Sequence, residues 1–236
     1  MPQVQTQPTL VEQVVNAIVS EIVDGDLPAN SRLIQDELAR AYGVSRQPVQ
    51  QALLLLRDRG LVREAPGRGL IVAPLDVDFV RDLYELRAML DGLAGKLAAE
   101  RGARRAKEEG PAYLEAGRAA VESGSLHEQI EADMRFHAFV NELSANPLIG
   151  ETTAPHWAYL RRVMAEVLRD DAQMPQTILQ EHVAILDAII AGDGARAETL
   201  SREHISRAAK IFVQRLKARQ EASEEEMRQR RTRRIR

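Results

Sequence analysis

The sequence predicts a mainly α-helical protein with one small β-hairpin in its N-terminal part. Apolar residues recur three and four positions apart along most of the 236-residue chain, which is the spacing of amphipathic helices. Aromatic residues make up only 4% of the chain, whereas Ala, Leu, Glu and Arg are abundant, and this balance favours helices over sheets. The hairpin is indicated by two short apolar-rich segments around a Gly/Pro turn.

The composition limits the class of protein. The chain has no cysteine, which excludes disulfides and thiolate metal sites and fits a reducing cytoplasm. No uncharged apolar run approaches the roughly 20 residues that a membrane helix needs. The N-terminal residues lack the basic start and apolar block of a secretion signal. We therefore expect a soluble, cytoplasmic protein without a membrane partner.

The first two helices are expected to form part of a small N-terminal domain. The first begins after Thr9, which forms a capping box with Glu12, and its apolar residues keep a helical spacing until Gly25. A short second helix is expected over residues 34–42, and Gly43 ends it.

The third helix is expected to begin at Ser45 and to end at Gly60, with Pro48 in the first turn, where a missing backbone N–H costs little. Its N-terminal end is polar and its later part is rich in leucine. This division suits a recognition helix whose first turns face the major groove of DNA. The leucines assigned to the core are Leu53, Leu54 and Leu56.

The segments LVREA and LIVAP flank the turn PGRG and predict the hairpin. Helix, helix, glycine turn, helix and hairpin is the element order of a winged helix-turn-helix, here with a basic wing tip. The alternative is a generic three-helix core with a solvated face, but the wing and the local excess of arginine favour DNA binding. The predicted DNA-contacting residues are Ser45, Arg46, Gln47, Gln50 and Arg68.

The run LARAYGVSRQPVQQALLLLRDRGLVREAPGRGLIV resembles the DNA-binding domain of GntR-type bacterial transcription regulators. The resemblance covers nearly all of the first 75 residues. It implies a regulator, commonly a repressor, that binds an inverted repeat in a double-stranded DNA operator as a homodimer. The arginine usual after PV is Gln50 here, so we expect a different base preference at that contact.

The remaining chain predicts an all-helical bundle. A helix is expected from Phe79, with a leucine seam from Leu83 to Leu97, and the charged stretch ARRAKEEGP over residues 103–111 is expected to interrupt it. Glycine and proline punctuate the later helices, which are expected over residues 111–122, 126–144, 147–170, 175–191 and 194–220. The expected domains are a DNA-binding domain over residues 1–75, a helical bundle over residues 76–220, and a charged, solvated tail over residues 221–236.

Four polar residues occupy positions on the apolar faces of these helices. Asp133 and His137 lie four residues apart in ADMRFHAFV, and His182 and His204 lie on the inward stripes of two later helices. A buried carboxylate is unfavourable unless it is compensated. A divalent metal bound by three imidazoles and one carboxylate would compensate all four groups together.

The order D-x3-H, then H, then H, after a GntR-type domain, resembles the FCD ligand-binding domain of the FadR subfamily, and six expected helices suggest its shorter VanR-like branch. Metal-containing members use the four matching positions. The resemblance implies a divalent metal (zinc, nickel or manganese) at the floor of a cavity for a small carboxylate effector, and a dimeric domain. The family also commonly has an arginine and an acid at positions that match Arg87 and Asp91. Arg87 is therefore expected either to bind the effector carboxylate or to form an i,i+4 ion pair with Asp91.

Three other interpretations of the bundle remain open. A metal-dependent hydrolase with an accessory winged helix would need a general base, and no further inward Glu or His is evident. A purely structural metal site would have all its positions filled by protein ligands. Without any metal, the four residues would form a buried hydrogen-bonded cluster.

Overall fold

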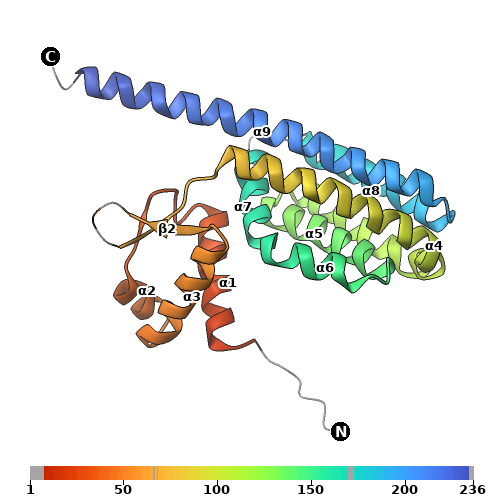
Figure 1. Cartoon of the computed structure of the whole chain (residues 1–236), viewed down its shortest axis with the longest axis horizontal. Coiled ribbons are helices and arrows are strands. Elements are labelled where there is room, and N and C mark those ends of the chain that lie inside the picture. Colours follow the sequence, from red (N-terminus) through yellow and green to blue (C-terminus); the bar gives the residue numbers. More distant parts are fainter. Residues whose placement is uncertain (1–7, 66, 68, 170–172, 234–236) are drawn as a thin grey trace, which may run out of the picture. The chain divides into compact units, whose positions relative to one another are not determined.

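The computed structural model describes the backbone of residues 8–65, 67, 69–169 and 173–233, and beyond residue 223 only the side chain of Glu225. Figure 1 shows the elements in chain order. Contacts along the chain group it into two compact units. The first comprises Met1–Leu75 and Pro155–Arg162, and the second comprises Asp76–Ala154 and Val163–Arg236.

Helix α1 (Leu10–Asp24) has the predicted capping box. The hydroxyl oxygen of Thr9 accepts from the backbone N–H of Glu12 at 3.2 Å, and the Glu12 carboxylate accepts from the backbone N–H of Thr9 at 2.7 Å. Gly25 ends the helix in a left-handed conformation that favours glycine, with φ of 94°. The prediction for this helix is therefore confirmed at both ends.

Helices α2 (Gln35–Ala41) and α3 (Arg46–Asp58) form the helix-turn-helix. The turn between them includes Gly43, which has a φ of 65°. Ser45 occupies the N-cap position of α3 as predicted, but its side chain makes no capping hydrogen bond. Leu53 and Leu56 are fully buried, whereas the prediction for Leu54 was wrong, because Leu54 lies on the opposite side of α3 and is 41% exposed.

The predicted hairpin is confirmed as β2 (Val62–Glu64) and β3 (Leu70–Val72), which pair antiparallel with Val62 opposite Val72. A further strand, β1 (Arg32–Leu33), pairs with the other edge of β3, so the strand order is β1-β3-β2. The sequence did not predict β1, because two residues are too few to establish a period of two.

The second unit is a helical bundle in which α4 packs against α5, α8 and α9 (Figure 1). Its core consists of aliphatic and aromatic side chains such as Phe136, Phe139 and Ile189. The bounds are Val77–Ser123 for α4, Leu126–Leu143 for α5, Pro147–Thr153 for α6, Met174–Ile190 for α8 and Gly194–Arg233 for α9. Helix α7 (Trp157–Leu168) contributes to both units.

The expected interruption over residues 103–111 was wrong, because α4 continues through it. The buried stripe there consists of Gly102, Ala106 and Gly110, which are too small to stand out as an apolar pattern. Pro111 lies on the exposed side of α4 and does not end the helix, although proline has no backbone N–H to donate to the preceding turn. An ion pair between Arg105 and Glu109, 2.9 Å from Nε to Oε1, adds support one turn apart.

Two later boundaries also differ from the prediction. The helix expected over residues 147–170 is divided into α6, a 3-10 turn (Ala154–His156) and α7, because Pro155 cannot continue the hydrogen-bond ladder of α6. Helix α9 continues through Arg233, beyond its expected end at residue 220, so most of the expected tail has helical backbone. In the described part of the chain, no helix combines the length and apolarity needed to cross a membrane.

Candidate metal centre

The four predicted ligands come together inside the bundle. Asp133 and His137 are on α5, His182 is on α8 and His204 is on α9. Each residue offers one ligand atom, and these atoms all lie within 4.8 Å of one another. All four residues are less than 9% exposed. Residues distant in sequence thus converge on one buried point with three imidazole nitrogens and one carboxylate oxygen.

Two of the imidazoles are oriented from behind by carboxylates. The Nδ1 atom of His137 lies 2.8 Å from Asp91 Oδ1, and the Nδ1 atom of His204 lies 2.6 Å from Glu181 Oε2. Since an ionised carboxylate only accepts hydrogen bonds, each Nδ1 carries a proton, and in the neutral form of each ring the lone pair is on Nε2. The two Nε2 atoms lie only 3.3 Å apart. Such lone pairs repel one another unless a cation or a shared proton lies between them.

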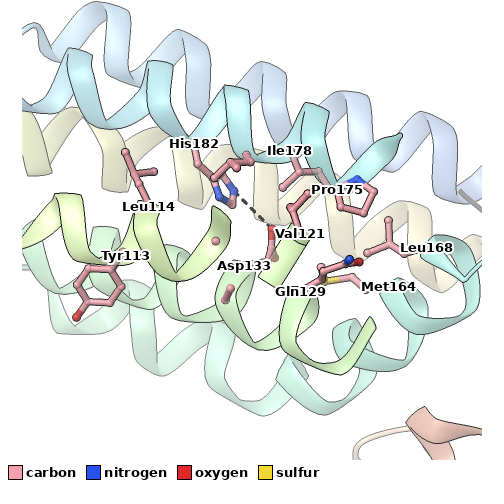
Figure 2. Close-up of a pocket in the computed structure, with 13 residues that line it drawn as sticks. Tyr113, Leu114, Val121, Gln129, Asp133, Met164, Leu168, Pro175, Ile178 and His182 are labelled. Carbon is pink, nitrogen blue, oxygen red and sulfur yellow. Dashed lines mark ion pairs between the residues drawn. The ribbon is translucent and has the colours of Figure 1, made fainter. Parts of the chain in front are cut away.

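His182 is positioned by stacking. Its ring lies parallel to that of Phe136, with centroids 4.0 Å apart. Its Nε2 atom is directed at Asp133 Oδ1, at 3.4 Å, as the dashed line in Figure 2 marks. The geometry does not make this a hydrogen bond, so the buried Nε2 has no hydrogen-bond partner among the described residues. A buried nitrogen without a hydrogen-bond partner beside a carboxylate fits the role of a metal ligand.

The protonation of these histidines also suits metal binding. Burial lowers the pKa of His182 well below its ordinary value, and His204 and His137 lower it further. Burial likewise lowers the pKa of His204, although the hydrogen bond to Glu181 opposes this effect. Both imidazoles are therefore neutral near neutral pH, which is the form that binds a metal.

Arg87 forms the ion pair that was the alternative to effector binding. Its Nε atom lies 3.5 Å from Asp91 Oδ2, both side chains are buried, and its guanidinium lies 5.6 Å from the centroid of the Tyr84 ring. Burial alone would raise the pKa of Asp91, but Arg87 and the hydrogen bond from His137 outweigh it and hold that pKa below its usual range. A direct contact between Arg87 and an effector stays a prediction.

The sequence missed the role of the two carboxylates behind the histidines. Asp91 was considered only as the partner of Arg87, and Glu181 was not singled out at all. Glu181 directly precedes His182, so it points about 100° away from the inward face of α8. Only the position of α9 shows that it meets His204 and Arg207. No pattern within one helix contains that information.

A small cavity adjoins the centre. Its volume is about 30 Å³, and Asp133 and His182 are among the residues that line it (Figure 2). The other walls are formed by α4, α7 and further residues of α5 and α8. The candidate metal centre therefore adjoins a space that is large enough for about two water molecules.

In the first unit, the residues predicted to contact DNA form one exposed group. Ser45, Arg46, Gln47 and Gln50 are all exposed at the N-terminal end of α3. The side chain of Arg46 is 72% exposed, and its Nη2 atom donates to Asp36 Oδ2 at 2.6 Å. Arg68, the fifth predicted contact, lies outside the described residues.

A winged helix-turn-helix joined in one chain to a C-terminal helical bundle is the architecture of a class of transcription regulators. Residues 10–72 match the bacterial regulatory proteins of the gntR family, and residues 82–207 match the FCD domain. The chain belongs to the GntR family and carries an FCD domain. It is a DNA-binding transcriptional regulator, and regulators of this family typically act as dimers.

Individual relatives agree with this assignment. An HTH-type transcriptional regulator from an unstable DNA locus of Streptomyces ambofaciens is 30% identical over 194 residues, which is 82% of this chain and 80% of that protein. The HTH-type transcriptional repressor RspR of Escherichia coli K12 is 26% identical over 200 residues, 85% of this chain and 87% of RspR. The solved structure of E. coli McbR/YncC has the same fold, with a TM-score of 0.76 at 22% identity, over 89% of this chain and 99% of that one.

Proposed function

We propose that the protein is a repressor whose helical bundle binds a divalent metal and, through it, the carboxylate of a small organic acid. The observation that carries this proposal is the pair of Nε2 atoms 3.3 Å apart, each on an imidazole whose Nδ1 is held by a carboxylate. Asp133 and His182 would complete the ligand set. A bound cation would supply the positive charge that pairs with the acid.

The donor set limits the metal but does not select one. Three imidazoles and one carboxylate suit zinc, nickel and manganese. Four protein ligands fill a tetrahedral zinc site, whereas an ion that takes five or six ligands keeps positions for the acid. An effector role is therefore best served by a metal with more than four ligands.

The regulator is favoured over the metal-dependent hydrolase by the placement of the two carboxylates that hold the histidines. Asp91 and Glu181 both accept from imidazole Nδ1 atoms, on the side of each ring away from the cluster. A general base has to take a proton from a water molecule bound to the metal. Neither carboxylate is placed to do so. The relatives named above are regulators and a repressor, and this also favours the non-enzymatic reading.

For the DNA, we propose that a homodimer binds an inverted repeat through two copies of α3. Arg46 and Gln50 would reach base edges or adjacent phosphates, and Arg68 would reach the DNA from the wing. Asp36 holds Arg46 at the exposed start of α3, so the guanidinium is already oriented. Gel-shift titration of Arg46→Ala should show a weaker complex with the operator, and affinity equal to that of the wild type would contradict the assignment.

The metal proposal is tested by His182→Ala. We expect the purified variant to lose the metal, to melt roughly 5–10 °C lower because the stabilisation by a bound ligand is lost, and to stop responding to the acid. Its operator affinity without acid should match that of the wild type. His127→Ala, an exposed histidine on α5, is the control and should change nothing. Wild-type protein that carries no metal and cannot be loaded with zinc, nickel or manganese would refute the proposal.

A further inference from the structure

The cavity beside Asp133 and His182 is mostly hydrocarbon on its other sides (Figure 2). Its walls come from the C-terminal part of α4, from α5, from the end of α7 and from the first half of α8. A molecule that enters the cavity therefore meets apolar groups from several helices. The principal ones are Leu114, Val121, Met164, Leu168, Ile178 and Leu179.

Polar groups are few at this cavity. Gln129 lies one turn before Asp133 on α5, and its amide nitrogen donates to the carbonyl of Ala120 at 3.4 Å. Tyr113 stacks its ring on Phe139, with centroids 4.1 Å apart. None of the described residues that line the cavity is a lysine or an arginine. The cavity thus offers one charged end and an apolar remainder.

This lining discriminates between classes of organic acid. A second carboxylate or a row of hydroxyl groups would lose its water here without gaining a cation or enough hydrogen-bond partners, which is unfavourable. Arg87 does not supply that cation, because it is paired with Asp91 and is not among the lining residues. A hydrocarbon chain is favoured instead, by about fourfold in affinity for each methylene group that it buries.

We infer that the acid bound by this domain is a monocarboxylic acid with a short apolar chain. Its carboxylate lies at the end of the cavity formed by Asp133 and His182, and its chain extends between α4, α7 and α8. The inference rests on the proposed function, because the metal is what holds the carboxylate. It extends that function by naming the chemical class of the effector.

The dimensions of the cavity limit the length of the acid's hydrocarbon chain. A volume of about 30 Å³ holds about two water molecules, so a chain of roughly two to four carbons requires some wall side chains to move. Met164 suits this movement, because methionine side chains adapt their shape easily. On α4, Gly117 lets the Leu179 side chain pack closely, since a Cβ there would lie 3.0 Å from Leu179 Cδ1, so a larger residue at position 117 would take up room in the cavity.

Matched acids test the inference on purified, metal-loaded wild-type protein. Calorimetric titration compares acetate, propionate and butyrate, and then compares butyrate with succinate, in which a carboxylate replaces the terminal methyl group. We expect affinity to rise about fourfold per added methylene, and succinate to bind at least ~10-fold more weakly than butyrate. A flat series, or succinate binding as tightly as butyrate, overturns the inference.

A pair of leucine substitutions on α4 tests where the hydrocarbon chain of the bound acid lies. Gly117→Leu fills the cavity and should weaken butyrate binding about tenfold, while acetate and metal binding stay unchanged. Ala119→Leu adds the same side chain at an exposed position of the same helix and is the control. Butyrate binding by Gly117→Leu that equals that of the control overturns the inference. If circular dichroism shows that Gly117→Leu is misfolded, the wild-type acid series decides alone.

The two proposals fail in different ways. Metal-loaded protein that binds none of the acids refutes acid sensing as a whole, and with it this inference. Protein that binds succinate in preference to butyrate retains the proposed function and loses only the apolar-chain assignment. Titration of the metal itself, in the absence of any acid, separates both results from a failure of the metal centre.

Discussion

At the scale of single residues, the candidate centre depends on hydrogen bonds that fix which nitrogen of each imidazole carries a proton. Glu181 holds His204 at 2.6 Å and also pairs with Arg207, whereas Asp91 holds His137 at 2.8 Å and pairs with Arg87. Each carboxylate thus contacts both a cation and an imidazole, Asp91 through its two different oxygens and Glu181 through Oε2 for both. Partners of this kind orient a metal ligand and raise its basicity.

Removing one of these partners should weaken metal binding without removing a ligand. We predict that Glu181→Ala lowers metal affinity about 10–100-fold, the usual effect of losing such a partner, and that Glu181→Gln, which keeps an acceptor, loses less. Glu203→Ala, an exposed glutamate next to His204, is the matched control. Competition titrations with a chelator measure the affinities. Equal affinity of Glu181→Ala and Glu203→Ala would show that His204 does not depend on Glu181.

Gln50 offers a second test at this scale. Glutamine pairs best with adenine N6 and N7, whereas arginine reads guanine O6 and N7. We predict that Gln50→Arg shifts the preference at the contacted base toward guanine by about 1–3 kcal/mol. Selection from a randomised operator library measures the shift. An unchanged base preference would mean that Gln50, which is exposed near the start of α3, contacts only phosphate.

The sequence identified the four predicted ligands because each one breaks an apolar stripe, and a stripe is visible within a single helix. Their convergence on one point is what the structure adds. Asp91 and Glu181 could not be assigned to His137 and His204 in this way, because those contacts join different helices. Local patterns predict which residues are buried, whereas contacts between helices require their packing.

At the scale of helices, α4 shows the limit of apolar patterns. Its contact with α9 depends on residues that have almost no side chain. A Cβ at Gly95 would lie 2.5 Å from Ser201 Oγ and 2.9 Å from the Ala197 carbonyl oxygen. The buried residues over 102–110 are equally small, and for this reason the sequence did not predict that α4 continues there. Helix ends that depend on glycine or a capping box, such as those of α1, were predictable because the signal is local.

Two identical substitutions in helices should therefore have opposite effects. Gly95→Ala forces α9 away from α4, because the nearest atom that cannot yield is a backbone oxygen, and we predict a loss of about 1–3 kcal/mol in unfolding free energy. At Gly150, in α6, a Cβ meets nothing within 4 Å, so Gly150→Ala should stabilise the helix by up to about 1 kcal/mol. Denaturant unfolding compares the two. Similar stability of both variants would contradict the close packing of α4 and α9.

At the scale of the whole molecule, regulation requires that acid binding in the bundle changes DNA binding by the first unit. An acid that binds equally well to every conformation of the dimer shifts nothing, however tightly it binds. The dimer must therefore have two states that differ both in acid affinity and in the spacing of the two α3 helices. For a repressor that is released by its effector, the acid favours the state that fits the operator less well.

This coupling has a measurable consequence that does not depend on knowing either state. Linkage requires that an acid which weakens operator binding by some factor, typically about 5–150, is itself bound more weakly by the same factor when operator DNA is present. We predict this equality for the metal-loaded dimer with the preferred monocarboxylic acid. Calorimetric titrations of acid into free and operator-bound protein give one factor, and operator titrations with and without acid give the other. Protein stripped of metal by a chelator should show a factor of one in both experiments, because the acid then lacks its anchor. If the acid releases the operator from loaded protein but binds equally well with and without saturating DNA, the release does not pass through the proposed site.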